Sequence, residues 1–274
     1  VTLCSSALAK NKKPKKNIEN IQAEHLAIND PNVIRHADTK TVYLKSKNAI
    51  IIDYDTNKIL LEKNAYARII PASMTKIMTS YLIEEKLKNG EVSNDLLLLV
   101  SEKAWRMQGS KTFVPLGEEV RLEDLLKGII IQSGNDASIV AAEGLYGSEE
   151  NFVDAMNDMI NKMGLKDTHF DNASGWPSPT HYSTVYDLAQ LGRRLIKDHP
   201  EYYSIYSEKT FTFGKDSKNI PITQGNRNPL LYKDLGCDGI KSGHTDEGGY
   251  SLLLSFISNE RRYIAVINGL KSAK

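Results

Sequence analysis

The chain has 274 residues, of which 41% are hydrophobic and 25% charged, and its formal net charge is +1. This length and composition predict a globular protein with one large domain or two closely packed ones. The even charge balance argues against nucleic acid or a bulk membrane surface as the partner, and no apolar run is long enough to span a bilayer.

The N-terminal region is expected to precede the folded domain. Residues 1–9 lack an initiator Met and end in Ala7-Leu8-Ala9, which resembles the end of a secretory signal peptide. We therefore expect a signal peptide remnant and an exported protein, in the periplasm or on the outer face of the cytoplasmic membrane. Residues 10–40 open with a basic run and are expected to form a weakly ordered leader, with attraction to an anionic surface as the alternative.

The two cysteines do not predict a disulfide. Cys4 lies in the signal-like segment that processing would remove, which leaves Cys237 without a partner. No basic residue adjoins Cys237, so we interpret it as a small buried hydrophobe and not as a nucleophile. A lipidated Cys4 is the less favoured alternative, because Leu3 is larger than the small residue expected before such a cysteine.

A hairpin and a helix are expected to begin the main domain, residues 41–274. Two β-rich runs, 50–52 and 59–61, flank turn-forming residues. The sequence Pro71-Ala72-Ser73-Met74-Thr75-Lys76 then begins a helical pattern. Ser73 and Lys76 are three positions apart and so share one face, where a neutral lysine amine could deprotonate the serine hydroxyl. Ser-x-x-Lys alone is common, and it also fits an ordinary polar helix start.

The remaining pattern predicts a helical part inserted into an antiparallel sheet. Residues 101–170 are mostly helical, and Ser133-Gly134-Asn135 interrupts them after an apolar run. A further helix is expected at 184–197 with a cap at its start. Three strands follow, at 239–245, 250–257 and 263–267, the first of which carries Lys241-Ser242-Gly243. The predicted fold class is therefore α/β plus all-α, with a cleft where the two parts meet.

These three short motifs, in this order, are the signature of penicillin-binding proteins and class A β-lactamases. From about residue 42 onward, the chain resembles low-molecular-mass penicillin-binding proteins of the D-alanyl-D-alanine carboxypeptidase family. Residues 164–170 and 224–228 also resemble that family. The resemblance implies the transpeptidase-like fold, removal of the terminal D-Ala from peptidoglycan pentapeptide stems, covalent inhibition by β-lactams, and a role in cell-wall synthesis and cell shape. It implies no cofactor.

The resemblance also implies a catalytic role for each motif residue. Ser73 would attack the penultimate D-Ala carbonyl while Lys76 accepts its proton. Ser133 would pass a proton toward the leaving nitrogen. Asn135 would either bind the substrate amide or fix Lys76.

A second set of residues is expected to bind the substrate. Lys241 would attract the terminal carboxylate, and Ser242, where the family usually has Thr, would donate a hydrogen bond to it. Gly243 leaves room for the extended peptide. By resemblance, the backbone N–H of His244 completes an oxyanion hole together with that of the nucleophile. Arg227 is either a second carboxylate contact or part of a structural ion pair.

Other functions are less favoured by the sequence. A class A β-lactamase would need Glu-x-x-Asn between the second and third motifs, and residues 136–240 contain no such sequence. A non-catalytic penicillin sensor and a DD-endopeptidase remain alternatives, and the endopeptidase is the closer of the two. The six histidines show no paired ligand spacing, so no metal site is expected. Many family members continue into a β-rich domain and an amphipathic helix, which would give peripheral membrane attachment through a segment not present here.

Overall fold

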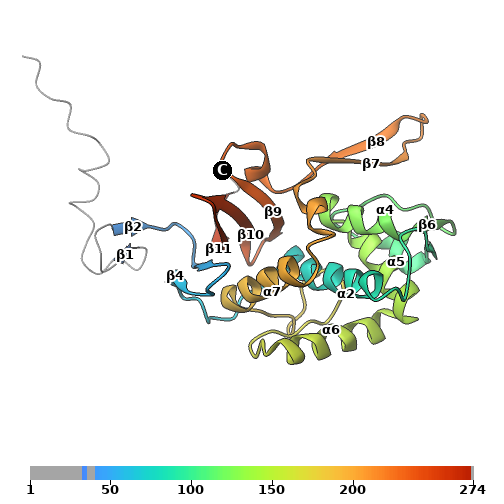
Figure 1. The fold of residues 1–274 in the computed structure, drawn as a ribbon. Coiled ribbons are helices and arrows are strands. Elements are labelled where there is room, and N and C mark those ends of the chain that lie inside the picture. Colours follow the sequence, from blue (N-terminus) through green and yellow to red (C-terminus); the bar gives the residue numbers. More distant parts are fainter. Residues whose placement is uncertain (1–32, 36–40, 273–274) are drawn as a thin grey trace, which may run out of the picture. The chain divides into compact units, whose positions relative to one another are not determined.

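The computed structural model describes residues 33–35 and 41–272. Five antiparallel strands form one sheet in the order β4-β3-β11-β10-β9, with bounds β3 (Asn48–Asp53), β4 (Ile59–Lys63), β9 (Cys237–Thr245), β10 (Gly249–Ser258) and β11 (Arg261–Leu270). This sheet belongs to the main unit of the chain, which begins at Ser46. Because β3 pairs with β11, with Ile50 opposite Val266, the sheet joins strands from both ends of the main unit (Figure 1). A separate unit, ending at Lys45, contains the two-stranded pair β1 (Val33–Arg35) and β2 (Thr41–Tyr43).

Two helices lie against one face of the five-stranded sheet. These are α2 (Lys76–Lys88) and α7 (Val185–Asp198) (Figure 1). The α7 helix approaches closely at Gly192, where an added Cβ would lie 2.8 Å from a methyl group of Leu253. Thr184 caps α7 by accepting a hydrogen bond from the N–H of Asp187, as its sequence predicts.

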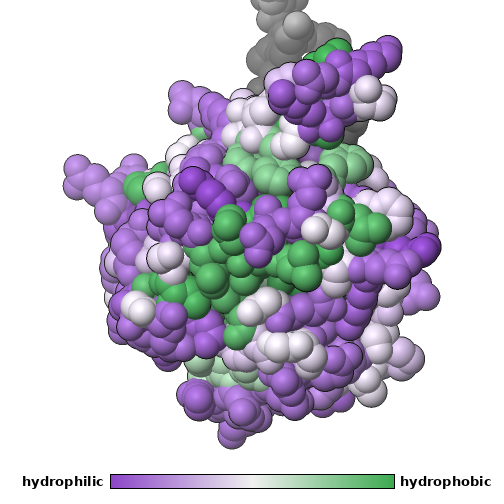
Figure 2. Space-filling model, turned by 90° about the vertical axis from the view of Figure 1, so that its right-hand side faces the viewer, coloured by the Kyte–Doolittle hydropathy of each residue, from purple (hydrophilic) through white to green (hydrophobic). Residues whose placement is uncertain are grey.

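The helical part lies between α2 and α7 in sequence. Its elements are β5 (Leu97–Leu99), α3 (Glu102–Arg106), β6 (Glu119–Arg121), α4 (Leu122–Lys127), the π-helical turn η2 (Gly128–Gln132), α5 (Asn135–Tyr146) and α6 (Glu149–Met163). Leu97 and Leu99 are 50% and 62% exposed. Figure 2 views the molecule from the side of the helical part and shows an apolar area bordered by hydrophilic residues. The predicted fold class, an antiparallel sheet flanked by helices with an inserted helical part, is confirmed.

Local structure differs from the sequence prediction in two places. The helix expected at Ser73 begins as a 3₁₀ helix, η1 (Ala72–Thr75), and α2 starts only at Lys76. A second hairpin, β7 (Thr210–Lys215) with β8 (Pro221–Gly225), was not predicted. It projects from the rest of the main unit near α4 (Figure 1). In addition, η3 (Tyr203–Ser207) and η4 (Pro229–Tyr232) are short 3₁₀ helices.

Among the described residues, no helix combines the length and the hydrophobicity that crossing a bilayer requires. The predicted signal peptide remnant and most of the predicted leader lie outside the described residues. Both remain predictions.

A buried carboxyl in α2, that of Glu84, makes the stability of the fold depend on pH. Glu84 is fully buried, accepts a hydrogen bond of 2.8 Å from the Tyr206 hydroxyl, and has its pKa raised well above the usual value by burial. A raised folded-state pKa stabilises the fold at low pH, and this contribution is lost as pH rises above the unfolded-state pKa toward the folded-state one. Glu84→Gln should therefore gain stability relative to wild type by about 1 kcal/mol per pH unit within that window. Urea unfolding at pH 5 and pH 8 checks this, and an identical difference at both pH values would contradict it.

Candidate active site

The Ser73 hydroxyl, on η1, and the Lys76 amine, at the start of α2, lie side by side. Ser73 Oγ is 3.2 Å from Lys76 Nζ. Ala72, which precedes the serine, has a φ of +50°, an uncommon conformation for a residue with a side chain. Gly175 packs against it, and a Cβ at Gly175 would overlap the Ala72 carbonyl oxygen. Gly175 itself has a φ of +80°. The turn that carries Ser73 is therefore packed against the turn that contains Gly175, which is distant in sequence.

Lys76 is fully buried and makes two further hydrogen bonds. Its Nζ donates to Asn135 Oδ1 at 2.7 Å and to the Ser174 carbonyl oxygen. Of the two roles that the sequence left open for Asn135, the structure shows the contact with Lys76. The amide nitrogen of Asn135 donates to the Gln108 carbonyl at 2.6 Å, which holds the side chain in place.

The surroundings of Lys76 favour its neutral form. Burial lowers its pKa well below the usual value, and the positive charges of Lys241 and Arg227 lower it further against the opposing charge of Asp136. A neutral amine has two N–H groups and one lone pair. Asn135 and Ser174 accept from the two N–H groups, so the lone pair is free to accept the Ser73 hydroxyl proton.

Ser133 occupies a special position at the end of η2. Its φ is +62°, in the left-handed region, and its Oγ is buried without a hydrogen-bond partner among the described residues. Ser133 and Ser73 line the same cavity. A buried hydroxyl without a partner is costly, so a ligand in the cavity would gain by hydrogen bonding to it. The next residue must be small, because a Cβ at Gly134 would overlap the Thr112 hydroxyl.

Asp136 holds residues 112 and 113 against the start of α5. Its carboxylate accepts hydrogen bonds from the N–H groups of Thr112 and Phe113, both at 2.8 Å, and of Ala137 at 2.9 Å. The last contact places an acceptor at the N-terminus of α5, where the helix dipole favours negative charge.

The third motif lies on β9, next to η1. Lys241 is 3% exposed, and burial together with the charge of Arg227 lowers its pKa to about 7. Gly243 lies close to the turn before Ser73, since an added Cβ would be 3.1 Å from the Pro71 carbonyl oxygen. The His244 ring packs on Tyr250 with 4.0 Å between ring centroids.

Arg227 also faces the cavity. Its Nε donates to the Gln132 carbonyl at 3.0 Å, and no ion pair of Arg227 occurs among the residues that the structure describes. A contact of Arg227 with the substrate carboxylate stays a prediction. The cavity, of about 770 Å³, is lined by residues of all three motifs, namely Ser73, Ser133, Ser242 and Gly243, and also by Arg227 and His244.

The sequence analysis missed the backbone groups that complete the site. The Ser174 carbonyl has no residue-type signature, because any amino acid can supply it. The Ser110 carbonyl accepts from the Asn135 N–H at 2.7 Å and was likewise not predicted. Gly175 was the one available signal for a tight turn. Within residues 33–35 and 41–272, no group of three or more His, Cys, Asp or Glu side chains is arranged to hold a metal ion.

Comparison with known proteins identifies the family. Residues 35–272 match the model of the D-alanyl-D-alanine carboxypeptidase family. The chain belongs to this family. The resemblance predicted from its motifs is thereby confirmed.

Three similar proteins illustrate the relationship. The D-alanyl-D-alanine carboxypeptidase DacA of Haemophilus influenzae is 40% identical over 84% of this chain and 58% of its own length. A D-alanyl-D-alanine endopeptidase of Pseudomonas aeruginosa is 30% identical over 77% of this chain and 67% of its own length. The solved structure of penicillin binding protein 5 from Haemophilus influenzae has a TM-score of 0.81 at 38% identity, covering 85% of this chain and 68% of that one. The chain thus spans a little under three fifths of the curated carboxypeptidases it resembles.

Proposed function

We propose that this chain is the catalytic part of a serine-type D-alanyl-D-alanine carboxypeptidase, which removes the terminal D-Ala from peptidoglycan pentapeptide stems through an acyl-enzyme on Ser73. The observation that carries the proposal is the environment of Lys76. Its buried amine has both N–H groups accepted by Asn135 and Ser174, and it lies 3.2 Å from the Ser73 oxygen. A hydroxyl beside a neutral, oriented base is an activated nucleophile.

Acylation uses the groups that line the cavity. Ser73 Oγ bonds to the carbonyl carbon of the penultimate D-Ala, and its proton passes to Lys76 Nζ. The negative charge that develops on the carbonyl oxygen is stabilised by the backbone N–H groups of Ser73 and His244. Ser133 delivers a proton to the nitrogen of the terminal D-Ala as the C–N bond breaks, and Lys76 returns a proton to Ser133. The products are an ester on Ser73 and free D-Ala.

Deacylation repeats the proton transfer with water as the nucleophile. Lys76 accepts a proton from the water that attacks the ester and passes it to the Ser73 oxygen as the ester bond breaks. A β-lactam would form the same ester with its ring opened. Between the second and third motifs, residues 136–240 lack the Glu-x-x-Asn that activates water in class A β-lactamases. We therefore propose that β-lactams inhibit this protein covalently, with the penicillin-derived ester persisting on Ser73.

Substrate binding depends on two positive charges, Arg227 in the lining of the cavity and Lys241 next to Ser242. Lys241 and Arg227 attract the free C-terminal carboxylate, to which Ser242 donates a hydrogen bond. Because the pKa of Lys241 is lowered to about 7, this lysine loses its charge as pH rises through neutrality. Burial and the charge of Lys241 also lower the pKa of Lys76 well below its usual value, which favours the neutral amine.

A pH dependence follows from the lowered pKa of Lys241. We expect kcat/KM for a pentapeptide with a free carboxylate to fall as pH rises above about 7, because the free enzyme loses a cation that binds the substrate. Steady-state kinetics between pH 6 and pH 9 test this. A constant or rising kcat/KM over the upper half of that range would contradict the assigned role of Lys241.

A DD-endopeptidase is the second candidate function, because a 30% identical relative bears that name. Three substrates separate the candidates: a synthetic pentapeptide, a cross-linked muropeptide dimer and benzylpenicillin. We expect release of D-Ala from the pentapeptide to be the fastest reaction, with slow cleavage of the dimer and one-time acylation by penicillin. Cleavage of the dimer in preference to the pentapeptide would favour the endopeptidase. Turnover of neither peptide would favour a penicillin sensor.

The proposed substrate also sets the location. Peptidoglycan stems lie outside the cytoplasmic membrane, which agrees with the signal-like sequence at residues 1–9. We therefore propose an exported protein that acts in the periplasm or on the outer face of that membrane.

A further inference from the structure

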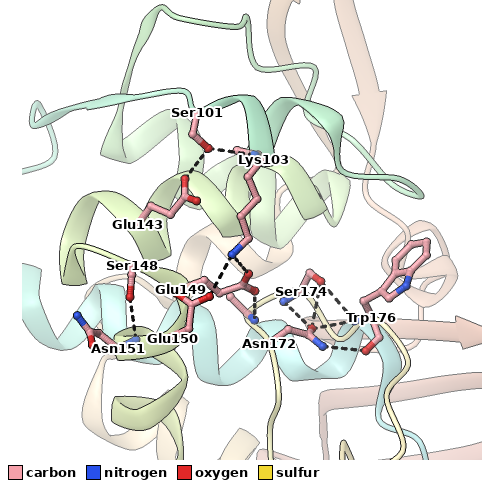
Figure 3. Close-up of polar contacts among 12 residues, drawn as sticks. Ser101, Lys103, Glu143, Ser148, Glu149, Glu150, Asn151, Asn172, Ser174 and Trp176 are labelled. Carbon is pink, nitrogen blue, oxygen red and sulfur yellow. Dashed lines mark hydrogen bonds and ion pairs between the residues drawn. The ribbon is translucent and has the colours of Figure 1, made fainter.

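The Ser174 carbonyl that accepts from Lys76 belongs to a turn, and the side chain of Asn172 closes this turn. Asn172 Oδ1 accepts hydrogen bonds from the backbone N–H groups of Ser174 at 3.2 Å, of Gly175 at 2.8 Å and of Trp176 at 2.9 Å (Figure 3). These bonds define the shape of the turn. They do not define where the turn lies relative to Lys76, so other contacts must position it.

Two contacts at Ala173 anchor the turn. The Ala173 carbonyl accepts a hydrogen bond of 2.6 Å from the Thr79 hydroxyl on α2. The Ala173 N–H donates to Glu149 Oε1 at 3.0 Å. Ala173 is fully buried and directly precedes Ser174, so its position determines that of the next carbonyl. Glu149 therefore holds the residue that directly precedes Ser174, whose carbonyl accepts a hydrogen bond from Lys76.

Glu149 is itself held firmly. It is the first residue of α6, where the helix dipole favours a carboxylate, and its side chain is 11% exposed. Its second oxygen, Oε2, pairs with Lys103 Nζ at 2.9 Å (Figure 3). The Ala173 N–H therefore bonds to an ionised, largely buried acceptor, and such bonds are about twice as strong as neutral ones.

Lys103 belongs to the short helix α3, which is tied to α5. The hydroxyl of Ser101, which caps α3, donates to Glu143 Oε2 on α5 at 2.6 Å (Figure 3). The first residue of α5 is Asn135, the other acceptor for the Lys76 amine. The two groups that accept hydrogen bonds from Lys76 are therefore connected. Asn135 belongs to α5, and Ser174 is linked to α5 through Glu149, Lys103 and α3.

We propose that Glu149 is a positioning residue for catalysis: by anchoring Ala173, it fixes the Ser174 carbonyl and keeps the lone pair of Lys76 directed at Ser73. This inference rests on the proposed function. Without the anchor the turn shifts, the amine rotates, and an N–H group replaces the lone pair beside the serine hydroxyl. Misplacing a reacting group by a fraction of an ångström to one ångström slows reactions by up to about 10². Non-covalent binding of the ligand should be unaffected, since Glu149 does not line the cavity.

The test compares Glu149→Ala, Glu149→Gln and Glu150→Ala. Glu150 is a matched control, because it adjoins Glu149, carries the same charge and also pairs with Lys103 Nζ, at 3.6 Å, but has a 78% exposed side chain. The Ala173 N–H donates to Glu149 and not to Glu150. Acylation by a fluorescent penicillin is followed over a range of concentrations, which separates the maximal acylation rate from the half-saturating concentration. Rates are normalised to the folded fraction measured by thermal unfolding.

Glu149→Ala should lower the maximal acylation rate about tenfold and leave the half-saturating concentration unchanged. Glu149→Gln keeps an oxygen for the Ala173 N–H and should retain most of the wild-type rate, as should Glu150→Ala. Wild-type acylation by Glu149→Ala, or Glu149→Gln as slow as Glu149→Ala, would overturn the proposal. If Glu149→Ala does not fold, Glu149→Met, of similar size but without an acceptor, takes its place with the same expected result. Failure of the wild-type protein to acylate would count against the proposed function instead.

Discussion

Ser73→Ala should abolish release of D-Ala from a pentapeptide while leaving the protein folded. The Ser73 hydroxyl is the only group in the proposed mechanism that bonds to the substrate carbonyl, so no slower route through another nucleophile is expected. Its one hydrogen-bond partner among the described side chains is Lys76, at 3.2 Å. Removing the hydroxyl therefore costs little packing. Enzymatic detection of free D-Ala and thermal unfolding of the same sample measure the two effects.

Ser110→Ala serves as a comparison for this variant. Ser110 lines the same cavity, but the proposed mechanism gives its hydroxyl no part in bond formation. Its backbone carbonyl, which accepts from the Asn135 N–H, is retained in the alanine variant. We expect measurable D-Ala release from Ser110→Ala. Residual release by Ser73→Ala at a similar level would mean that another group is the nucleophile.

Lys76→Met should lower the rate of Ser73 acylation by about 10²–10⁴, the usual contribution of a positioned general base. Methionine fills nearly the same volume and carries no charge into a fully buried site. Folding should be preserved, because burial disfavours the charged form of the native lysine. The loss of the donor to Asn135 Oδ1 and the Ser174 carbonyl opposes this gain. Acylation by benzylpenicillin, followed over hours by intact-mass spectrometry, gives the rate.

Lys86→Met provides the matched control. Lys86 lies on the same helix but forms its ion pair with Glu91 on the surface, at 2.7 Å. This variant should acylate at the wild-type rate. If Lys76→Met also acylated at that rate, a different group would have to accept the Ser73 proton, and the proposed role of the buried amine would be wrong.

The sequence predicted those parts of the site that depend on residue type and spacing. Ser73 and Lys76 are neighbours because they are three positions apart, although the turn between them is 3₁₀ and not α-helical. The first residue of that turn, Ala72, packs against Gly175 from a distant part of the chain. Local spacing therefore predicted the pair of residues, whereas the conformation of the turn and its tertiary contact were not predicted.

The parts that could not be predicted are backbone groups and their supports. The Ser174 carbonyl reaches Lys76 from 98 positions away, and nothing in the side chain of Ser174 signals this contact. The carboxylate of Asp136 was not predicted to hold residues 112 and 113, because that contact depends on how α5 packs. The hairpin β7–β8 was also missed, although Phe211 and Phe213 alternate with threonines.

Covalent trapping tests the central claim most directly, namely that the three motifs form one pocket for acyl transfer to Ser73. The wild-type protein is incubated briefly with benzylpenicillin, its intact mass is measured, and the adduct is located by peptide mapping. The proposed function predicts one added benzylpenicillin mass per chain, on the peptide that contains Ser73. An adduct on any other residue, or no adduct in a folded protein that binds the drug, would contradict it.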